Sequence, residues 1–176
     1  MEGRFVVLVS TNNPKSPKSS AAPFPADREL VLQRVLNAPR GKLWRCWTTP
    51  ELIVQWFTPT PWKTVRAVVD VRASGSSHIT MQSPEGLEFP NSGIYLEVVP
   101  HERLVFTDAF TCAWEPSAKP FMTCVLTFED AGNGQTKYTA RARHWTVADR
   151  EAHEKMGFHE GWGIATNQLE ALAQKI

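Results

Sequence analysis

The sequence has almost no net charge. Its 176 residues carry 19 Lys and Arg against 18 Asp and Glu, a formal net charge of +1. Proteins that hold nucleic acid or an anionic membrane through electrostatics usually carry a basic excess. We therefore expect no nucleic acid among the partners of this chain, and no charge-driven membrane binding.

Cysteine is scarce and shows no metal or redox spacing. Cys46, Cys112 and Cys124 are odd in number and far apart, and no Cys-x-x-Cys pair occurs. This usage favours a reducing compartment. The apolar residues 5–9 are too few for a signal-peptide core or a membrane span. We expect a cytoplasmic protein without membrane insertion.

Several catalytic and binding motifs are also missing. The sequence has no Gly-x-Ser-x-Gly elbow, no phosphate-binding loop and no dinucleotide fingerprint. His153 and His159 are six residues apart, about 240° around a helix, so they cannot bind one metal from the same face. His78 and His101 stand alone. We predict no metal site and no cofactor.

Aromatic residues are abundant but unevenly chosen. The chain has seven Trp and nine Phe against two Tyr, and these side chains contribute large apolar areas. A length of 176 residues fits one domain with a sizeable core. The aromatic residues either fill that core or line a cavity in it, and the composition leaves both interpretations open.

The chain divides into a short polar segment and one domain. Residues 1–26 are rich in Ser, Pro, Asn, Lys and Ala and are predicted to be a flexible lead-in, with residues 4–9 as an alternative edge strand. Residues 27–176 form the domain. It is expected to begin with a strand over 28–36 and two short helices over 41–48 and 49–56.

A run of strands is predicted after Pro61. Short turn signals separate the segments, which favours an antiparallel meander. The expected strands cover residues 62–72, 76–82, 88–99, 103–110, 121–129 and 135–145.

The last predicted element is one continuous helix over residues 147–173, with Thr146 as its cap. Its length would be about 40 Å. Glycines within it predict a kink or a close backbone approach. An apolar stripe runs along one face and comprises Phe158, Trp162, Ala165, Leu169, Leu172 and Ile176.

These elements predict an α+β helix-grip fold. In this fold a curved antiparallel β-sheet of six to seven strands, with two short helices, wraps around a long C-terminal helix. One helix cannot cover both faces of so long a sheet. We expect the sheet to curl around the helix and to leave a gap between them.

Three motifs, in order, resemble a known family. They are APRGKLWRCWTTPEL at residues 38–52 followed by Trp56, GIYLEVVPHERLVFT at 93–107, and HEKMGFHEGW at 153–162. They are similar to START-like (SRPBCC superfamily) domains, and within these to the branch named after the activator of heat-shock-protein-90 ATPase. The resemblance covers about residues 28–175 and implies the helix-grip fold. It leaves function open, because this superfamily includes lipid carriers, hormone receptors, polyketide cyclases and co-chaperone domains.

Alternation along the strands identifies candidate inward faces. Tyr138, Ala140, Ala142 and His144 share one face, and Met122, Cys124, Leu126 and Phe128 share another. For residues 94–98 both faces carry apolar groups, so neither can be assigned. His144 is the candidate catalytic residue, with Glu97 or Tyr95 as a partner for acid–base chemistry. Its alternative role is that of a buried histidine bonded to a backbone carbonyl.

The candidate cavity-lining residues are aromatic, Met and His side chains, which suit an apolar ligand. For any one of them, ordinary core packing is the competing interpretation. They are Trp56, Phe57, Trp62, Met81, Phe106, Phe110, Trp114, Met122, His144, Met156, Phe158 and His159.

Three functions are compatible with the sequence. The first is the binding of a small hydrophobic ligand, lipid-like or polycyclic aromatic, between sheet and helix. The second is a polyketide-cyclase- or dehydratase-like enzyme that uses His144 in the same cavity. The third is a co-chaperone-like protein-interaction domain. The ligand's identity and the oligomeric state, including a homodimer, stay open.

Overall fold

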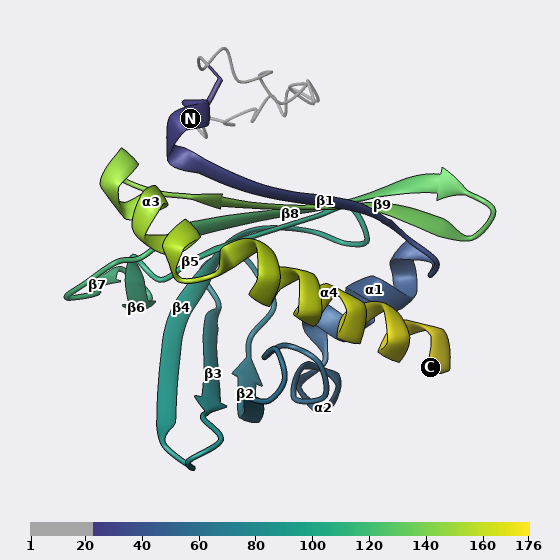
Figure 1. Ribbon diagram of the computed structural model, residues 1–176, viewed down its shortest axis with the longest axis horizontal. Coiled ribbons are helices and arrows are strands. Elements are labelled where there is room, and N and C mark those ends of the chain that lie inside the picture. The colour runs from purple at the N-terminus through teal and green to yellow at the C-terminus, as the bar shows by residue number, and fades with distance from the viewer. Residues whose placement is uncertain (1–22) are drawn as a thin grey trace, which may run out of the picture.

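The computed structural model describes residues 23–176 (Figure 1). Its helices and strands follow the predicted order, and the strands predicted over 76–82 and 88–99 have the observed bounds. The elements are η1 (Ala26–Arg28), β1 (Glu29–Leu36), α1 (Arg40–Thr48), α2 (Pro50–Ile53), β2 (Lys63–Val69), β3 (Ser76–Gln82), β4 (Glu88–Val99), β5 (Arg103–Thr107), β6 (Phe110–Cys112), β7 (Glu115–Pro116), β8 (Thr123–Gly132), β9 (Gln135–Arg143), α3 (Val147–Lys155) and α4 (Phe158–Lys175).

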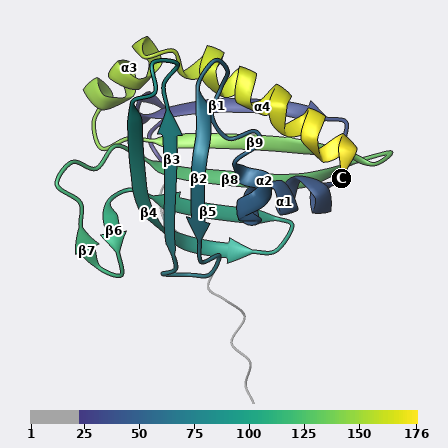
Figure 2. The same ribbon diagram turned by 90° about the horizontal axis from the view of Figure 1, so that it is seen from below.

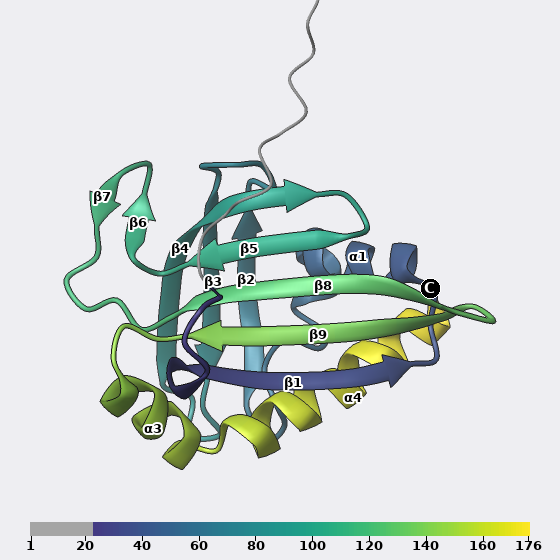
Figure 3. The same cartoon turned by 90° about the horizontal axis from the view of Figure 1, so that it is seen from above.

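The main sheet has seven antiparallel strands in the order β1-β9-β8-β5-β4-β3-β2. From β2 to β9 it is the predicted meander, with the β6–β7 hairpin inserted, and β1 then pairs with β9. The strands β2–β4 run steeply across β1, β8 and β9, so the sheet is strongly curved (Figure 3). Helix α4 crosses the concave side, with α1 and α2 near its C-terminal end (Figure 2). The helix-grip fold is confirmed.

The closing helix is not continuous, contrary to the prediction. It divides into α3 and α4 at Gly157, whose φ of 93° lies in the left-handed region that favours glycine. The predicted cap is correct: Thr146 and Asp149 form a capping box at the start of α3. With 18 residues, α4 is about 27 Å long. The kink expected from the glycines therefore occurs between two separate helices.

Other boundaries also differ from the prediction; the strand expected over residues 62–72, for example, ends at Val69. The strand expected over residues 103–110 ends at Thr107, because the carboxylate of Asp108 accepts hydrogen bonds from the backbone N–H groups of Phe121 and Met122 and fixes a turn. The chain then forms the separate β6–β7 hairpin, in a region predicted partly as a turn. The helix expected over 49–56 ends at Ile53.

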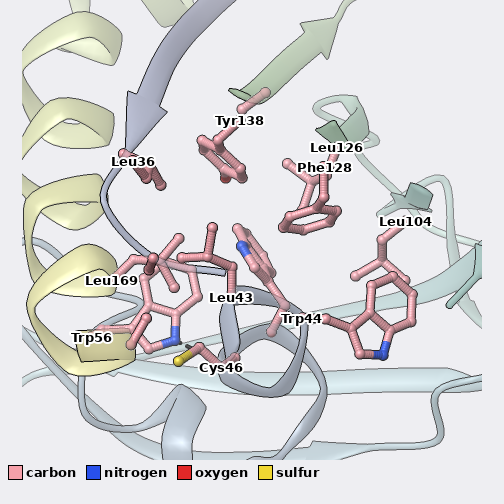
Figure 4. Packing of buried hydrophobic residues seen from close by; sticks show 14 of the residues in the cluster. Leu36, Leu43, Trp44, Cys46, Trp56, Leu104, Leu126, Phe128, Tyr138 and Leu169 are labelled. Atoms are coloured by element: carbon pink, nitrogen blue, oxygen red, sulfur yellow. Dashed lines mark hydrogen bonds between the residues drawn. The ribbon is translucent and has the colours of Figure 1, made fainter. Parts of the chain in front are cut away.

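A tightly packed core fills one end of the grip. Leu169 of α4 meets Leu36, Leu43 and Trp56 there, and the indole N–H of Trp56 donates to the carbonyl of Cys46 at 3.0 Å (Figure 4). The largest contact between α4 and another helix is with α1. The C-terminal half of α4 is thus a core helix.

The predicted inward faces of β8 and β9 are buried as expected, Tyr138 and Ala140 among them. The structure explains why no inward face could be assigned to residues 94–98 from the sequence. The register between β4 and β5 shifts between Tyr95 and Glu97, so the neighbouring Ile94 and Tyr95 are both buried.

The predicted lead-in falls mostly outside the described residues, which begin at residue 23. At its end, the ring of Phe24 lies under the guanidinium groups of Arg28 and Arg143, at 5.1 and 4.8 Å. Among residues 23–176, no helix combines the length and the apolar character needed to cross a bilayer.

Candidate functional site

A cavity of about 400 Å³ lies between the concave side of the sheet and the region where α3 meets α4. Its wall is mainly apolar. Strands β3, β4, β5 and β9 form one side, α4 forms the other, and aromatic residues from α1 and the segment after α2 close one end. The apolar lining side chains are Trp47, Trp56, Phe57, Pro59, Ile79, Met81, Ile94, Phe106, Phe121, Met122, Met156, Phe158, Trp162 and Ala165.

Small residues on the N-terminal half of α4 leave room for this cavity. Gly161 and Ala165 both line it, one helical turn apart. A Cβ at Gly161 would come no closer than 3.8 Å to Pro59. Gly157 also lines the space, where the chain turns from α3 into α4. The hollow therefore follows from the choice of residues along the helix.

Many of the residues predicted to line a cavity do so. The ones in the wall are Trp56, Phe57, Met81, Phe106, Met122, Met156 and Phe158. They lie in β3, β5 and α4, or directly beside α2, β8 and α3. The fold therefore brings segments together that are distant in the sequence. Whether these side chains contact a ligand stays a prediction.

The other predicted residues lie elsewhere. Trp62 packs on Phe89 with ring centroids 5.1 Å apart, near the start of β2 and of β4. Phe110 and Trp114 contact each other in the β6–β7 hairpin, where Trp114 is 65% exposed. The His159 side chain is 60% exposed and lies 3.6 Å from Glu154. None of these side chains belongs to the cavity wall.

His144 is buried, as expected, but lies behind the wall. Its Nδ1 is 3.2 Å from the carbonyl oxygen of Arg28 and its Nε2 is 2.9 Å from Nδ1 of His153. Neither suggested acid–base partner is hydrogen-bonded to His144. Glu97 pairs with Arg103 at 2.8 Å, and burial raises the pKa of Tyr95 to about 12. The alternative role of a carbonyl-bonded core histidine describes His144 correctly.

His153 is the histidine in the wall, and sequence reasoning missed it. The rings of His144, Phe121 and Phe158 surround the His153 imidazole. Their centroids lie 5.2, 4.6 and 5.1 Å from its own, in that order. Burial lowers the pKa of His153 to about 4, and the repulsion that would arise if both adjacent imidazoles were charged adds to the effect. The imidazole of His153 is therefore neutral at pH 7.

Most other polar groups in the wall already have protein partners. The Thr107 hydroxyl donates to the Met122 carbonyl at 3.1 Å, and the Thr166 hydroxyl donates to the Trp162 carbonyl at 2.7 Å. The Ser92 hydroxyl lies 3.0 Å from Nδ1 of His78. The Asn91 amide donates to the carbonyl of Phe89 at 3.0 Å. These bonds hold this part of the wall in shape.

Trp47, Tyr138 and Trp162 also line the cavity, although the sequence argument did not name them as wall residues. Tyr138 could have been found, because it shares the predicted inward face of β9. Trp162 could have been found as well, four residues after Phe158 in the apolar stripe. Burial raises the pKa of Tyr138 well above 10, so its hydroxyl stays protonated. The buried indole N–H of Trp47 has no partner among the described residues.

Within residues 23–176, no group of three or more His, Cys, Asp or Glu side chains is arranged to hold a metal ion. Cys46 and Cys124 are buried free thiols, and burial raises the pKa of Cys46 to about 11. These thiols are protonated at neutral pH. Neither has the lowered pKa of a reactive cysteine.

Comparison with known proteins places this site in a family context. The family described as Activator of Hsp90 ATPase homolog 1-like protein matches residues 37–174. No curated protein matches the chain.

Solved structures share the fold. A crystal structure of a protein from Nitrosomonas europaea is 43% identical, with a TM-score of 0.83, over 86% of this chain and 97% of its own. A Rhodobacter sphaeroides protein is 19% identical, with a TM-score of 0.74, over 88% and 97%. A Staphylococcus epidermidis protein is 26% identical, with a TM-score of 0.67, over 85% and 92%.

The family match spans most of the described domain and all three motifs noted in the sequence. The chain belongs to the family of Activator of Hsp90 ATPase homolog 1-like proteins, of the SRPBCC type.

Proposed function

We propose that this protein binds a small hydrophobic molecule in the cavity between the sheet and the N-terminal half of α4. The single observation that carries this proposal is a preformed space of about 400 Å³ with a mainly aromatic and aliphatic wall. Cavities of this size and character accept drug-sized apolar ligands. Burial of apolar ligand surface supplies about 25 cal/mol per Å².

A protein-interaction role receives less support from this geometry. A domain that acts only through its outer face has no need for an internal hollow, and filling one with side chains stabilises a core. The cavity therefore favours the small-molecule function over the co-chaperone-like alternative.

An enzymatic role in the same cavity is the second candidate, and one specific observation favours it. His153 is a neutral imidazole in the wall, held by a second histidine, which is an arrangement suited to proton transfer. In that case His153, rather than the predicted His144, would be the catalytic residue. Among the described residues, none that is hydrogen-bonded to His153 is a nucleophile.

Titration with N-phenyl-1-naphthylamine, an uncharged apolar fluorophore, tests the binding function. The wild-type protein should bind it with a rise in fluorescence. Ala165→Phe places a ring in the cavity and should weaken binding at least tenfold. Val35→Phe is the matched control, because Val35 is 58% exposed on β1 and away from the cavity wall. Absent binding, or equal binding by Ala165→Phe, contradicts the proposal.

Native mass spectrometry of the purified full-length protein extends this test to the natural ligand. A carried-over molecule should appear as extra mass on the wild type and on Val35→Phe. It should be missing from Ala165→Phe. Its release in organic solvent would then identify it.

A further inference from the structure

The two buried histidines form a hydrogen-bond chain that begins at a backbone carbonyl. A carbonyl oxygen can only accept, so Nδ1 of His144 must carry the proton in its 3.2 Å bond to the Arg28 carbonyl. The second nitrogen of a neutral imidazole is then an acceptor. His144 has no carboxylate among its hydrogen-bond partners, and a charge on this buried ring would lack compensation.

The same logic fixes the proton on His153. Nε2 of His144 is an acceptor, so Nδ1 of His153 donates to it across 2.9 Å. His153 is itself neutral at pH 7, because its pKa is lowered to about 4. Its Nε2 therefore carries a lone pair and no proton.

This lone pair is an uncommitted acceptor in the cavity wall. Nε2 of His153 has no hydrogen-bond partner among the described residues. Unlike the indole nitrogen of Trp47, it is not a fully buried atom. The Asn91 amide N–H and the Thr166 hydroxyl donate to backbone carbonyls, and the Ser92 hydroxyl lies beside His78. A ligand group that meets His153 can satisfy Nε2 only by donating a hydrogen.

The wall also indicates the charge of the ligand. It contains no Lys or Arg within the described residues, so a bound carboxylate would find no counter-charge. Asp108 is its one acidic side chain, and both carboxylate oxygens accept backbone N–H groups of Phe121 and Met122. A cation would therefore compete with the bonds that fix the turn after β5. An uncharged ligand meets neither difficulty.

We infer that Nε2 of His153 accepts a hydrogen bond from a hydroxyl or N–H group of an uncharged and otherwise apolar ligand. The cavity then selects neutral alcohols and phenols over carboxylate-bearing lipids of similar size. This inference rests on the proposed binding function and narrows its ligand class. The backbone carbonyl of Arg28 is the origin of the preference, because it sets the tautomers of both rings.

Three naphthalene probes separate this inference from simple apolar binding. Isothermal titration at pH 7.5 compares 2-naphthol, 2-methoxynaphthalene and 2-naphthoate on the full chain. The wild type should bind 2-naphthol about tenfold more tightly than 2-methoxynaphthalene, the value of one net hydrogen bond of about 1.4 kcal/mol. 2-Naphthoate should bind most weakly.

A matched variant assigns the preference to one atom. His153→Phe keeps a ring at this position and removes the acceptor. It should bind 2-methoxynaphthalene at least as well as the wild type does, and it should lose the preference for 2-naphthol. If the preference persists in this variant, another group such as the Tyr138 hydroxyl accepts the bond and the inference is wrong.

A spectroscopic measurement on the wild type needs no variant. The ring ¹⁵N spectrum should show His153 protonated at Nδ1 and bare at Nε2, and the Nε2 signal should shift with 2-naphthol and not with 2-methoxynaphthalene. A protonated Nε2 in the free protein overturns the inference. Equal binding of 2-naphthol and 2-methoxynaphthalene overturns it while leaving the binding function intact. The binding function itself fails if none of the three probes binds.

Discussion

The two halves of helix α4 perform different tasks against the same sheet. In the C-terminal half, Leu169 and Ala173 are fully buried in the packed core beside α1. In the N-terminal half, Gly161, Trp162 and Ala165 border the cavity. Gly161 and Ala165 leave open space beside Trp162, whereas the large aliphatic side chain of Leu169 faces a solid core. One amphipathic helix can thus stabilise the fold at one end and leave a binding space at the other.

Removing Leu169 should have the largest effect on stability. Leu169→Ala deletes a fully buried side chain from a packed region, so we expect a loss of about 3 kcal/mol in the free energy of unfolding. Urea denaturation measures it. Where the variant stays folded, it should still bind N-phenyl-1-naphthylamine. A binding loss as large as that of Ala165→Phe would break the distinction between the two halves.

Lowering the pH should destabilise the cavity half through His153. The folded pKa of about 4 lies below the unfolded value of about 6.5, so the unfolded chain binds more protons between these values. Stability is then fully present above pH 6.5 and falls as the pH is lowered towards 4, by at most about 3 kcal/mol. Denaturation at pH 7.5 and 4.5 measures the change.

The matched control for this effect is His153→Phe. Other groups titrate in the same range, so the quantity of interest is the difference between the two proteins. The variant should lose less stability than the wild type across the window. The same loss in both proteins would show that His153 does not contribute.

Two glycines near the cavity should respond in opposite directions, each by about 1 kcal/mol. Gly157→Ala should destabilise the protein, because φ at this position is 93° and an L-residue is strained there. Gly163→Ala should stabilise it, because the added methyl group meets nothing within 4 Å inside a regular helix. Thermal melts of both variants decide the matter. A loss in both would mean that Gly163 has a packing role.

The sequence patterns predicted the fold better than the site. Alternation along the strands and the stripe from Phe158 to Ile176 depend on local periodicity, which the printed sequence contains. For Gly157 the sequence indicates only that a kink is possible, because glycine is compatible with a continuous helix as well as with a left-handed turn. The strand end at Thr107 depends on the carboxylate of Asp108 reaching the chain at Phe121, a contact that no local pattern encodes.

A residue of the cavity wall could be predicted only where it is both apolar enough to be buried and on the inward face of its strand or helix. Phe106 and Phe158 are buried aromatic residues on inward faces. Trp114 is just as aromatic, but it belongs to a hairpin that leaves the sheet. His153 was missed because its role depends on the turn between β9 and α3, which brings it against His144. Spacing alone showed that His153 could not share a metal with His159, and it gave no sign of this contact.

The most direct test of the hollow itself is a crystal structure of the full chain under xenon pressure, because xenon enters apolar cavities that water leaves empty. The account predicts xenon between α4 and strands β3–β5, near Phe106 and Trp162, in the wild type and not in Ala165→Phe. A wild-type structure with no xenon there, and with side chains filling the space, would contradict it.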